Sequence, residues 1–298
     1  MLDWRVAAAF SEAAVSKILE RELALALSCC HRQEYPVAIL LAGQPGAGKT
    51  ELSTMLLSQM RGDAAFINGD DYRRCHPNYQ KLYAAYGSDS VSMTSAFSSA
   101  VTEGLIGQLS DAGRNLVIEG TGRTVEVPKS TAELLTGKGY RVEIAVIAAR
   151  PEVSLASTLL RFYQMNEGGT IPRSTALEAH DNIVSVLPEN LDALWTLSSI
   201  SRVSIWDREL TLLYDSGGSQ ELPSAILRRF WSRPWTEEEL SGVQNDLAVL
   251  RRKERESGLC QRESLDALAR RIETAAQTGS HSRARRAGPP PRRDAPLP

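Results

Sequence analysis

The chain reads Gly43-Gln44-Pro45-Gly46-Ala47-Gly48-Lys49-Thr50 at the point that decides its fold. This stretch fits G-x-x-x-x-G-K-[ST], the pattern of a phosphate-binding loop. The apolar run 37–41 before it predicts a buried parallel strand, and the segment 51–60 after it predicts a helix. A phosphate-binding loop needs this order of strand, loop and helix, so the stretch predicts an α/β fold of the P-loop NTPase type.

The residues of this loop predict how it holds a nucleotide. Glycine at 43, 46 and 48 permits backbone conformations and close approaches that a Cβ would block. The loop N–H groups can then converge on phosphate oxygens beside the positive end of the helix dipole. Lys49 would place its charge on the β- and γ-phosphates, and the Thr50 hydroxyl would bind Mg²⁺. We therefore expect residues 43–50 to bind a nucleoside triphosphate with Mg²⁺, and the full pattern argues against a glycine-rich turn that binds nothing.

The rest of the chain alternates between strand and helix patterns. The apolar, β-rich runs that predict further strands are 64–67, 115–119, 142–147, 203–206 and 212–214. The segments that predict helices are 77–86, 94–111, a helix that begins at Pro128, 151–166, a helix around His180 opened by the capping box Thr175-x-x-Glu178, 236–255 and 262–276. This alternation predicts a doubly wound parallel sheet flanked by helices.

Composition shifts divide the chain into four predicted parts. Residues 1–35 form an N-terminal segment, in which an amphipathic helix over 3–28 packs on the core or docks a partner. The P-loop domain spans 36–232, and a helical extension, capped by Thr236-x-x-Glu239, spans 233–278. Residues 279–298 are rich in arginine and proline, a composition that predicts a disordered basic tail.

Charge and hydropathy exclude several classes of protein. The formal net charge of −2 argues against a globally basic nucleic-acid-binding protein. No apolar run reaches the ~18 residues of a membrane span, and the N-terminus lacks a secretory signal pattern. The four cysteines show no C-x-x-C spacing, and neither they nor the histidines suggest a metal site. We therefore expect a cytoplasmic protein with reduced thiols.

Polar residues follow two of the predicted strands, where open α/β sheets bind their ligands. Asp70 follows the strand 64–67 and is the candidate base for an acceptor hydroxyl, because phosphoryl transfer needs such a group beside the nucleotide. Its neighbour Asp71 is interpreted as a helix-capping or surface residue. Arg161 and Arg173 are candidate clamps on the transferred phosphoryl group, since guanidinium offers donors that stay charged.

These motifs together resemble the zeta toxin family of bacterial toxin–antitoxin systems. The stretches that match in order are the loop 43–50; Ile67-Asn68-Gly69-Asp70 with Arg73 and His76-Pro77; Ile118-Glu119-Gly120-Thr121-Gly122-Arg123-Thr124 with Val127-Pro128; and Arg161 with Arg173. The resemblance runs from about residue 20 to about residue 255. It implies a P-loop kinase that uses ATP and Mg²⁺ to phosphorylate UDP-N-acetylglucosamine, blocks peptidoglycan synthesis, and has a protein antitoxin as partner.

The resemblance also implies roles for individual residues. Lys49 and Thr50 would hold the ATP phosphates and Mg²⁺, and Asp70 would take the proton from the 3′-hydroxyl of the sugar. Arg161 and Arg173 would stabilise the γ-phosphoryl group. The residues implied for the sugar-nucleotide site, besides Asp70, are Arg73, Glu103, Glu119, Thr121 and Arg123. Glu119 could instead act near Mg²⁺ from the end of its strand.

One position departs from the family pattern, and two other functions stay open. Family members often have Asp where this chain has Asn68, a change that removes a negative charge near the site. The same fold could phosphorylate another small hydroxyl acceptor, such as an antibiotic, a nucleotide or a nucleoside. It could also be a non-catalytic, ATP-dependent regulatory protein that uses its terminal helices and basic tail to bind a partner.

Overall fold

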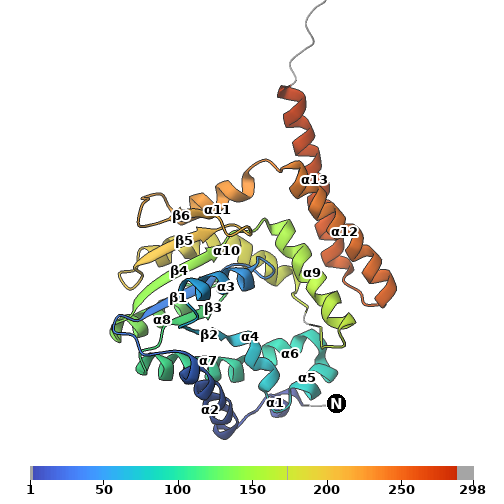
Figure 1. Ribbon diagram of the computed structural model, residues 1–298. Coiled ribbons are helices and arrows are strands. Elements are labelled where there is room, and N and C mark those ends of the chain that lie inside the picture. The colour runs from blue at the N-terminus through green and yellow to red at the C-terminus, as the bar shows by residue number, and fades with distance from the viewer. Residues whose placement is uncertain (1–2, 173, 287–298) are drawn as a thin grey trace, which may run out of the picture.

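The structure is a computed structural model that describes residues 3–172 and 174–286 (Figure 1). One six-stranded sheet forms its centre, in the order β2-β3-β1-β4-β5-β6. The strands are β1 (Val37–Ala42), β2 (Ala65–Asn68), β3 (Leu116–Glu119), β4 (Arg141–Ile147), β5 (Arg202–Trp206) and β6 (Leu212–Asp215). The first five strands pair in parallel, and β6 pairs antiparallel with β5 at the edge. The doubly wound parallel sheet predicted from the sequence is thus confirmed, with one antiparallel edge strand added.

Helices flank this sheet on both faces. They are α1 (Trp4–Ala7), α2 (Glu12–Cys29), α3 (Lys49–Gln59), α4 (Gly69–Tyr72), α5 (Tyr79–Tyr86), α6 (Ser90–Met93), α7 (Ser95–Asp111), α8 (Glu126–Gly137), α9 (Pro151–Glu167), α10 (Leu177–Trp195), α11 (Pro223–Ser232), α12 (Glu237–Ser257) and α13 (Arg262–Arg286), with short 3₁₀ turns η1 (Arg73–Cys75) and η2 (Gly87–Asp89). In the described part of the chain, none of these helices combines the length and the hydropathy needed to span a membrane.

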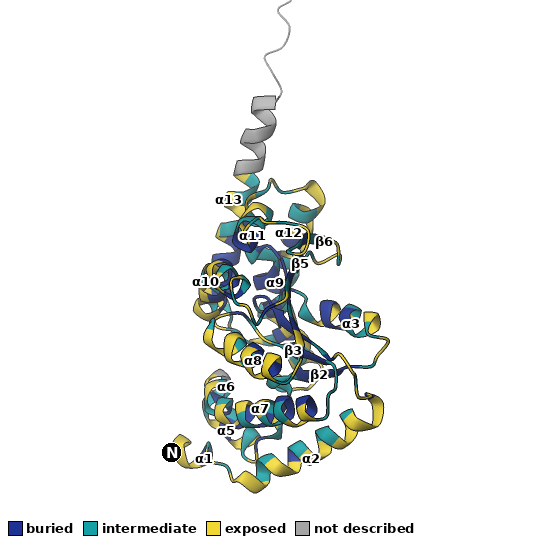
Figure 2. Cartoon of the chain, turned by 90° about the vertical axis from the view of Figure 1, so that its left-hand side faces the viewer, coloured by how far each residue is buried: buried dark blue, intermediate teal, exposed yellow. Residues whose placement is uncertain are grey.

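The central strand β1 explains how the two faces are covered. Successive side chains of a strand point to opposite faces. Ala38 and Leu40 belong to a core cluster shared with α7, α8, α10 and α11, whereas Ile39 and Leu41 belong to a second cluster shared with α3. Because residues 38–42 are all buried, in a sheet whose centre is coloured as buried in Figure 2, β1 reads as a continuous apolar run. Its carboxyl end lies between those of β3 and β4, where the connections diverge to opposite sides of the sheet.

The C-terminal helices α12 and α13 form a hairpin that packs along α9 (Figure 1). The buried residues of this contact include Leu155, Leu159 and Tyr163 from α9, Val243, Leu247 and Leu250 from α12, and Leu265, Leu268 and Ile272 from α13. The capping box predicted at the start of α12 is confirmed, since the Thr236 hydroxyl and the Glu239 carboxylate each accept from the other residue's N–H. We refer to α12 and α13 as the C-terminal hairpin.

Arg150, at the junction of β4 and α9, holds the connection between α11 and this hairpin. Its side chain is only 3% exposed, and it donates to the carbonyl groups of Trp231, Arg233 and Pro234 at 2.7 to 3.0 Å. Its guanidinium also stacks on the ring of Trp235. A single buried cation therefore satisfies three backbone carbonyls at once.

Replacing Arg150 with Ala should lower the free energy of unfolding by about 3 kcal/mol, because the three carbonyls lose their buried donor. Urea unfolding followed by circular dichroism measures this. The control is Arg228→Ala, which removes an exposed ion pair with Glu189 and should cost less than about 1 kcal/mol. Equal losses in the two variants would contradict this account of Arg150.

Several element boundaries differ from the predictions. The single helix predicted over 3–28 is wrong: α1 and α2 are separated by residues 8–11, because Asp3 caps one helix and Ser11, in extended conformation, caps the other. The capping box predicted at Thr175 is also wrong, since α10 has Ala176 at its N-cap with no side-chain cap. The neighbouring Ser174 hydroxyl instead donates to Gln261 in the C-terminal hairpin.

The sequence patterns also missed further boundaries and one long helix. Helix α8 begins at Glu126, so Pro128 lies inside its first turn, where a missing N–H costs nothing. The helix predicted from Pro77 begins at Tyr79, and α11 was not predicted. Helix α13 continues to Arg286, so the tail predicted to be disordered from residue 279 is helical in its described part. Alanine and arginine, both good helix formers, extend an existing helix at this point.

Candidate functional site

The phosphate-binding loop lies between β1 and α3, and its shape depends on glycine. Gly46 has a φ of +76°, and a Cβ at this position would lie 2.1 Å from the carbonyl oxygen of Ser154. Gly48 is left-handed, with a φ of +107°, and precedes α3 without any side-chain cap. The loop therefore packs directly on the backbone of α9 while the N-terminus of α3 stays open to a ligand, as a phosphate cradle requires.

Lys49 lies at the centre of the site and is 10% exposed at its side chain. Its Nζ donates to the carbonyl oxygens of Gly43 (2.9 Å) and Gln44 (3.3 Å), and lies 3.9 Å from a carboxylate oxygen of Glu119. Burial lowers the pKa of Lys49, the charge of Glu119 opposes that shift, and the charge of Arg161 adds to it. Charges of both signs thus meet at this site, from Lys49 on α3, Glu119 on β3 and Arg161 on α9.

The carboxylate of Glu119 ends β3 on the other side of Lys49. Burial raises its pKa, while the charge of Lys49 lowers it and those of Asp70 and Asp71 raise it further. Asn68 is directly opposite Glu119 in the pairing of β2 with β3. Glu119 was predicted to line the sugar-nucleotide site or to act near Mg²⁺, and the structure places its carboxylate beside Lys49.

Asp70 stands on the short helix α4, which begins directly after β2. The side chain of Asn68 caps this helix by accepting from the N–H of Asp70 at 3.1 Å, so the cap is Asn68 and not Asp71. The Asp70 carboxylate is 62% exposed and accepts from Nε of Arg73 at 2.7 Å. Arg73 is itself fixed by the carbonyl of Val91 at 2.6 Å. An exposed carboxylate is thus held in one orientation at the carboxyl end of the sheet.

The oxygen groups beside Lys49 fit a magnesium ion. The exposed Thr50 hydroxyl follows Lys49 in the first turn of α3, and the Glu119 carboxylate lies across from Lys49. Hard oxygen donors of this kind, completed by water and phosphate, are what Mg²⁺ prefers. Arg161 is exposed on α9, and its charge acts on both Lys49 and Glu119.

The remaining predicted residues are less closely tied to this centre. Thr121 and Arg123 follow β3 in one turn, where the Thr121 hydroxyl accepts from the N–H of Arg123 at 3.4 Å. Glu103 is exposed on α7, the helix whose Ser98 hydroxyl donates to the carbonyl of Gly69. Within the described part of the chain, no hydrogen bond or ion pair joins Glu103 to Lys49 or Asp70. Arg173 lies outside the described residues.

The sequence patterns missed the side chains behind the loop. The Gln44 side chain is fully buried and donates to the carbonyl of Ala149 at 2.7 Å and to the Ser154 hydroxyl at 3.3 Å. That hydroxyl lies 2.9 Å from Nε2 of His180, which is also fully buried. These residues come from three distant segments and share no spacing, so no local pattern could have brought them together.

Burial of His180 predicts a dependence of stability on pH. Burial lowers its pKa; Asp181 and Glu152 oppose this shift, and Arg271 adds to it. Between the ordinary pKa of about 6.5 and the lower folded value, the unfolded chain binds a proton that the folded protein does not. Stability should therefore fall as pH falls below about 6.5, with a slope of up to about 1.4 kcal/mol per pH unit from this residue.

Urea unfolding at pH 7.5, 6.5 and 5.5 measures this slope. In the variant His180→Gln the residue does not titrate, so its free energy of unfolding should decline less steeply over this range than that of the wild type. Parallel pH profiles for the two proteins would show that His180 does not titrate as its burial requires.

Comparison with known proteins places the chain in a family. A family model described as "Zeta toxin" matches residues 21–219. "Toxin PezT" of Streptococcus pneumoniae serotype 4 is 40% identical over 212 residues, which cover 70% of this chain and 83% of that protein. "Toxin zeta" of Streptococcus pyogenes is 39% identical over 184 residues, which cover 61% of this chain and 64% of that protein.

Solved structures agree with this placement. A structure from the PezAT chromosomal toxin–antitoxin system of Streptococcus pneumoniae has a TM-score of 0.73 and 34% identity, and covers 84% of this chain and 98% of its own. The AvrRxo1-ORF1:-ORF2 complex has a TM-score of 0.59 at 16% identity, covers 89% of this chain and 92% of its own, and shares the fold alone. Since the family model matches more than half of the chain and the PezT relative is 40% identical over most of its own length, this protein belongs to the zeta toxin family and has a P-loop kinase fold.

Proposed function

We propose that this protein is an ATP-dependent kinase that transfers the γ-phosphoryl group to the 3′-hydroxyl of UDP-N-acetylglucosamine. One observation carries the proposal: at the carboxyl end of the sheet, Nζ of Lys49 lies 3.9 Å from the Glu119 carboxylate, and the charges of Asp70 and Arg161 act on both residues. A nucleotide loop alone would fit a switch or a motor. A carboxylate and an arginine beside the loop supply the parts that phosphoryl transfer needs.

The nucleotide would bind with its β- and γ-phosphates at the N-terminus of α3. In the structure Lys49 rests on the carbonyls of Gly43 and Gln44, close to where the phosphates would lie, so only a short movement of Nζ is needed. Thr50, with Glu119 nearby, would hold Mg²⁺, which when bound neutralises charge on the phosphate oxygens. Arg161 on α9, together with Arg173, would donate to the transferred group as its charge spreads.

Asp70 would act as the base for the acceptor hydroxyl. Its carboxylate is exposed to an incoming sugar, and Arg73 keeps one of its oxygens engaged. The carboxylate would accept the proton of the 3′-hydroxyl while the oxygen of that hydroxyl bonds to phosphorus and the ADP oxygen leaves. Glu103, Thr121 and Arg123, around the same edge of the sheet, would bind the sugar nucleotide.

We further propose that the protein is the toxin of a toxin–antitoxin pair and acts in the bacterial cytoplasm, where both substrates are made. The PezAT system, which combines a toxin of this family with an antitoxin, supports the expectation of a protein antitoxin. Loss of free UDP-N-acetylglucosamine would stop peptidoglycan synthesis, so the activity would be toxic without that partner.

An acceptor panel tests the proposal. Purified protein is mixed with ATP, Mg²⁺ and, in separate reactions, UDP-N-acetylglucosamine, UDP-glucose, a nucleoside and an aminoglycoside, and ADP release is recorded. We expect the fastest release with UDP-N-acetylglucosamine. Faster ADP release with another acceptor would show that acceptor to be the preferred substrate. ATP binding without ADP release in any reaction would indicate a regulatory protein.

A further inference from the structure

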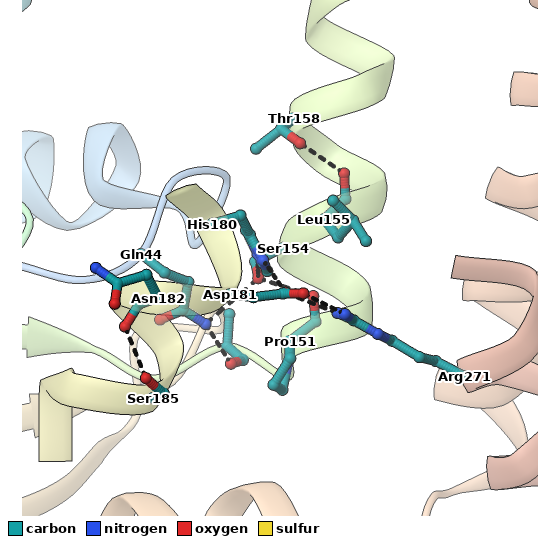
Figure 3. Close-up of polar contacts among 11 residues, drawn as sticks. Gln44, Pro151, Ser154, Leu155, Thr158, His180, Asp181, Asn182, Ser185 and Arg271 are labelled. Carbon is teal, nitrogen blue, oxygen red and sulfur yellow. Dashed lines mark hydrogen bonds and ion pairs between the residues drawn. The ribbon is translucent and has the colours of Figure 1, made fainter. Parts of the chain in front are cut away.

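A row of polar side chains, buried at the end nearer the loop, connects the phosphate-binding loop with the C-terminal hairpin (Figure 3). It begins at the Gln44 amide, which donates to the Ser154 hydroxyl, and continues to Nε2 of His180. Nδ1 of His180 lies 3.1 Å from Oδ1 of Asp181, and Arg271 of α13 donates to both oxygens of Asp181 at 3.0 and 2.5 Å. We call these five residues the loop-anchoring row.

The row resembles a nucleophilic Ser-His-Asp set, but burial excludes that chemistry. Gln44, Ser154 and His180 are each 0% exposed, so no substrate atom can reach the hydroxyl or the ring. Buried polar groups that bond to one another instead fix each other's positions, because each would lose a partner if its neighbour turned away. The row is therefore a support for the loop.

The hydrogen bonds of the row have a defined direction. The Asp181 carboxylate, which is paired with Arg271, can only accept, so Nδ1 of His180 carries the proton and Nε2 of the neutral ring is an acceptor. The Ser154 hydroxyl donates to Nε2, which would otherwise be a buried acceptor without a partner, and its lone pairs then accept from Gln44. If the Ser154 hydroxyl donated instead to the carbonyl of Pro151, which lies at 3.0 Å, Nε2 of His180 would have no donor.

Gln44 transmits this support to the nucleotide site through its backbone. Its carbonyl oxygen accepts from Nζ of Lys49 at 3.3 Å and from the N–H of Ala47 at 3.1 Å. A shift of the Gln44 side chain would therefore move both the turn of the loop and the resting place of the lysine. The geometry of the cradle depends on a side chain that faces away from the nucleotide.

We propose that Ser154 and His180 are positioning residues for the phosphate-binding loop, and that the Asp181–Arg271 contact makes ATP affinity depend on the C-terminal hairpin. Arg271 lies beyond the residues 21–219 that the family model matches, so the hairpin adds a contact to the loop-anchoring row from outside that region. The inference rests on the proposed function only in that the loop binds ATP.

The ATP dissociation constant of full-length variants, measured by calorimetry with Mg²⁺, tests the inference. Ser154→Ala and His180→Asn each break the link between the ring and Gln44, and should weaken ATP binding about fivefold, the effect of one hydrogen bond. His180→Gln places an amide where Nε2 lies, so it keeps an acceptor for Ser154 and loses only the contact with Asp181; its ATP binding should weaken no more than about threefold, as in Arg271→Met below. The KM of the acceptor should not change in any of them.

Two controls separate positioning from stability. Ser110 is a buried helical serine that donates to the carbonyl three residues before it, as Ser154 can, and accepts from Lys138, far from the loop. Ser110→Ala should lose stability but keep its ATP affinity. Arg271→Met should weaken ATP binding about threefold, whereas Lys253→Met, which removes the ion pair of the hairpin with Glu167, should leave it unchanged.

The outcomes distinguish a role in positioning the loop from a role in stability alone. Unchanged ATP affinity in Ser154→Ala and His180→Asn, or an equal loss in Ser110→Ala, would overturn the positioning role. If Ser154→Ala does not fold, the pair Arg271→Met and Lys253→Met still decides, because equal affinities in that pair would overturn the link to the hairpin. If the variants bind ATP more weakly but the wild type transfers no phosphoryl group, only the proposed function is wrong. If the wild type transfers the phosphoryl group but the variants bind ATP as tightly as it does, only this inference is wrong.

Discussion

We expect the substitution Lys49→Met to lower kcat/KM for phosphoryl transfer by about 10³-fold. The side chain keeps its stem but loses the charge that would lie on the β- and γ-phosphates. The loss is large because Lys49 is buried beside Glu119, where the dielectric is low and no solvent cation can take its place. Steady-state ADP release with UDP-N-acetylglucosamine measures it.

A stability measurement separates lost charge from lost folding. Lys49→Met removes the cost of burying a charge, but it also takes the donor from the carbonyls of Gly43 and Gln44 and the partner from Glu119, so its free energy of unfolding should fall by about 1 to 3 kcal/mol. We expect the variant to stay folded at the assay temperature, as circular dichroism measures, while activity is lost. A variant that retains a tenth of the wild-type rate would contradict the role given to Lys49.

Asp70→Asn should lower kcat by about 10³-fold, within the range of ~10² to 10⁴ that a positioned base contributes, and leave the KM for ATP within about twofold. The amide keeps the shape of the carboxylate and can still accept from Arg73, but it cannot take a proton. Initial rates at varied ATP and sugar-nucleotide concentrations separate the two constants.

Asp71→Asn is the matched control, because Asp71 is the next residue of the same short helix and its charge also acts on Glu119. It should change kcat less than about threefold if only Asp70 receives the proton. Equal losses in the two variants would show that the region supplies negative charge and no specific base, and an active Asp70→Asn would remove Asp70 from the reaction.

The sheet and the loop could be predicted because their signals are local. A buried parallel strand is a continuous apolar run, as in 37–41, and the glycines and Lys49 of the loop follow it in a fixed pattern. The position of Asp70 was predicted for the same reason, since strand ends meet at one edge of a parallel sheet, whereas Glu119 was named from the family resemblance. Their ion pairs with Arg73 and Lys49 could not be foreseen from that rule.

The errors arose where several local signals compete or where contacts are distant. Thr175 and Ser174 both precede α10, but the hydroxyl of Ser174 is taken by Gln261 in the C-terminal hairpin and α10 begins without a side-chain cap. Asn68, which the family pattern marks as a change near the site, is the cap of α4. The contact of His180 with Ser154 depends on the packing of α9 on α10, which no window of sequence contains.

The identity of the product tests the central claim most directly. Wild-type protein is incubated with ATP, Mg²⁺ and UDP-N-acetylglucosamine, and the sugar nucleotide is analysed by mass spectrometry and by phosphorus NMR. The account predicts a product heavier by one phosphoryl group, esterified at the 3′-hydroxyl, and none with Asp70→Asn. An unmodified sugar nucleotide, or a phosphate on any other oxygen, would contradict it.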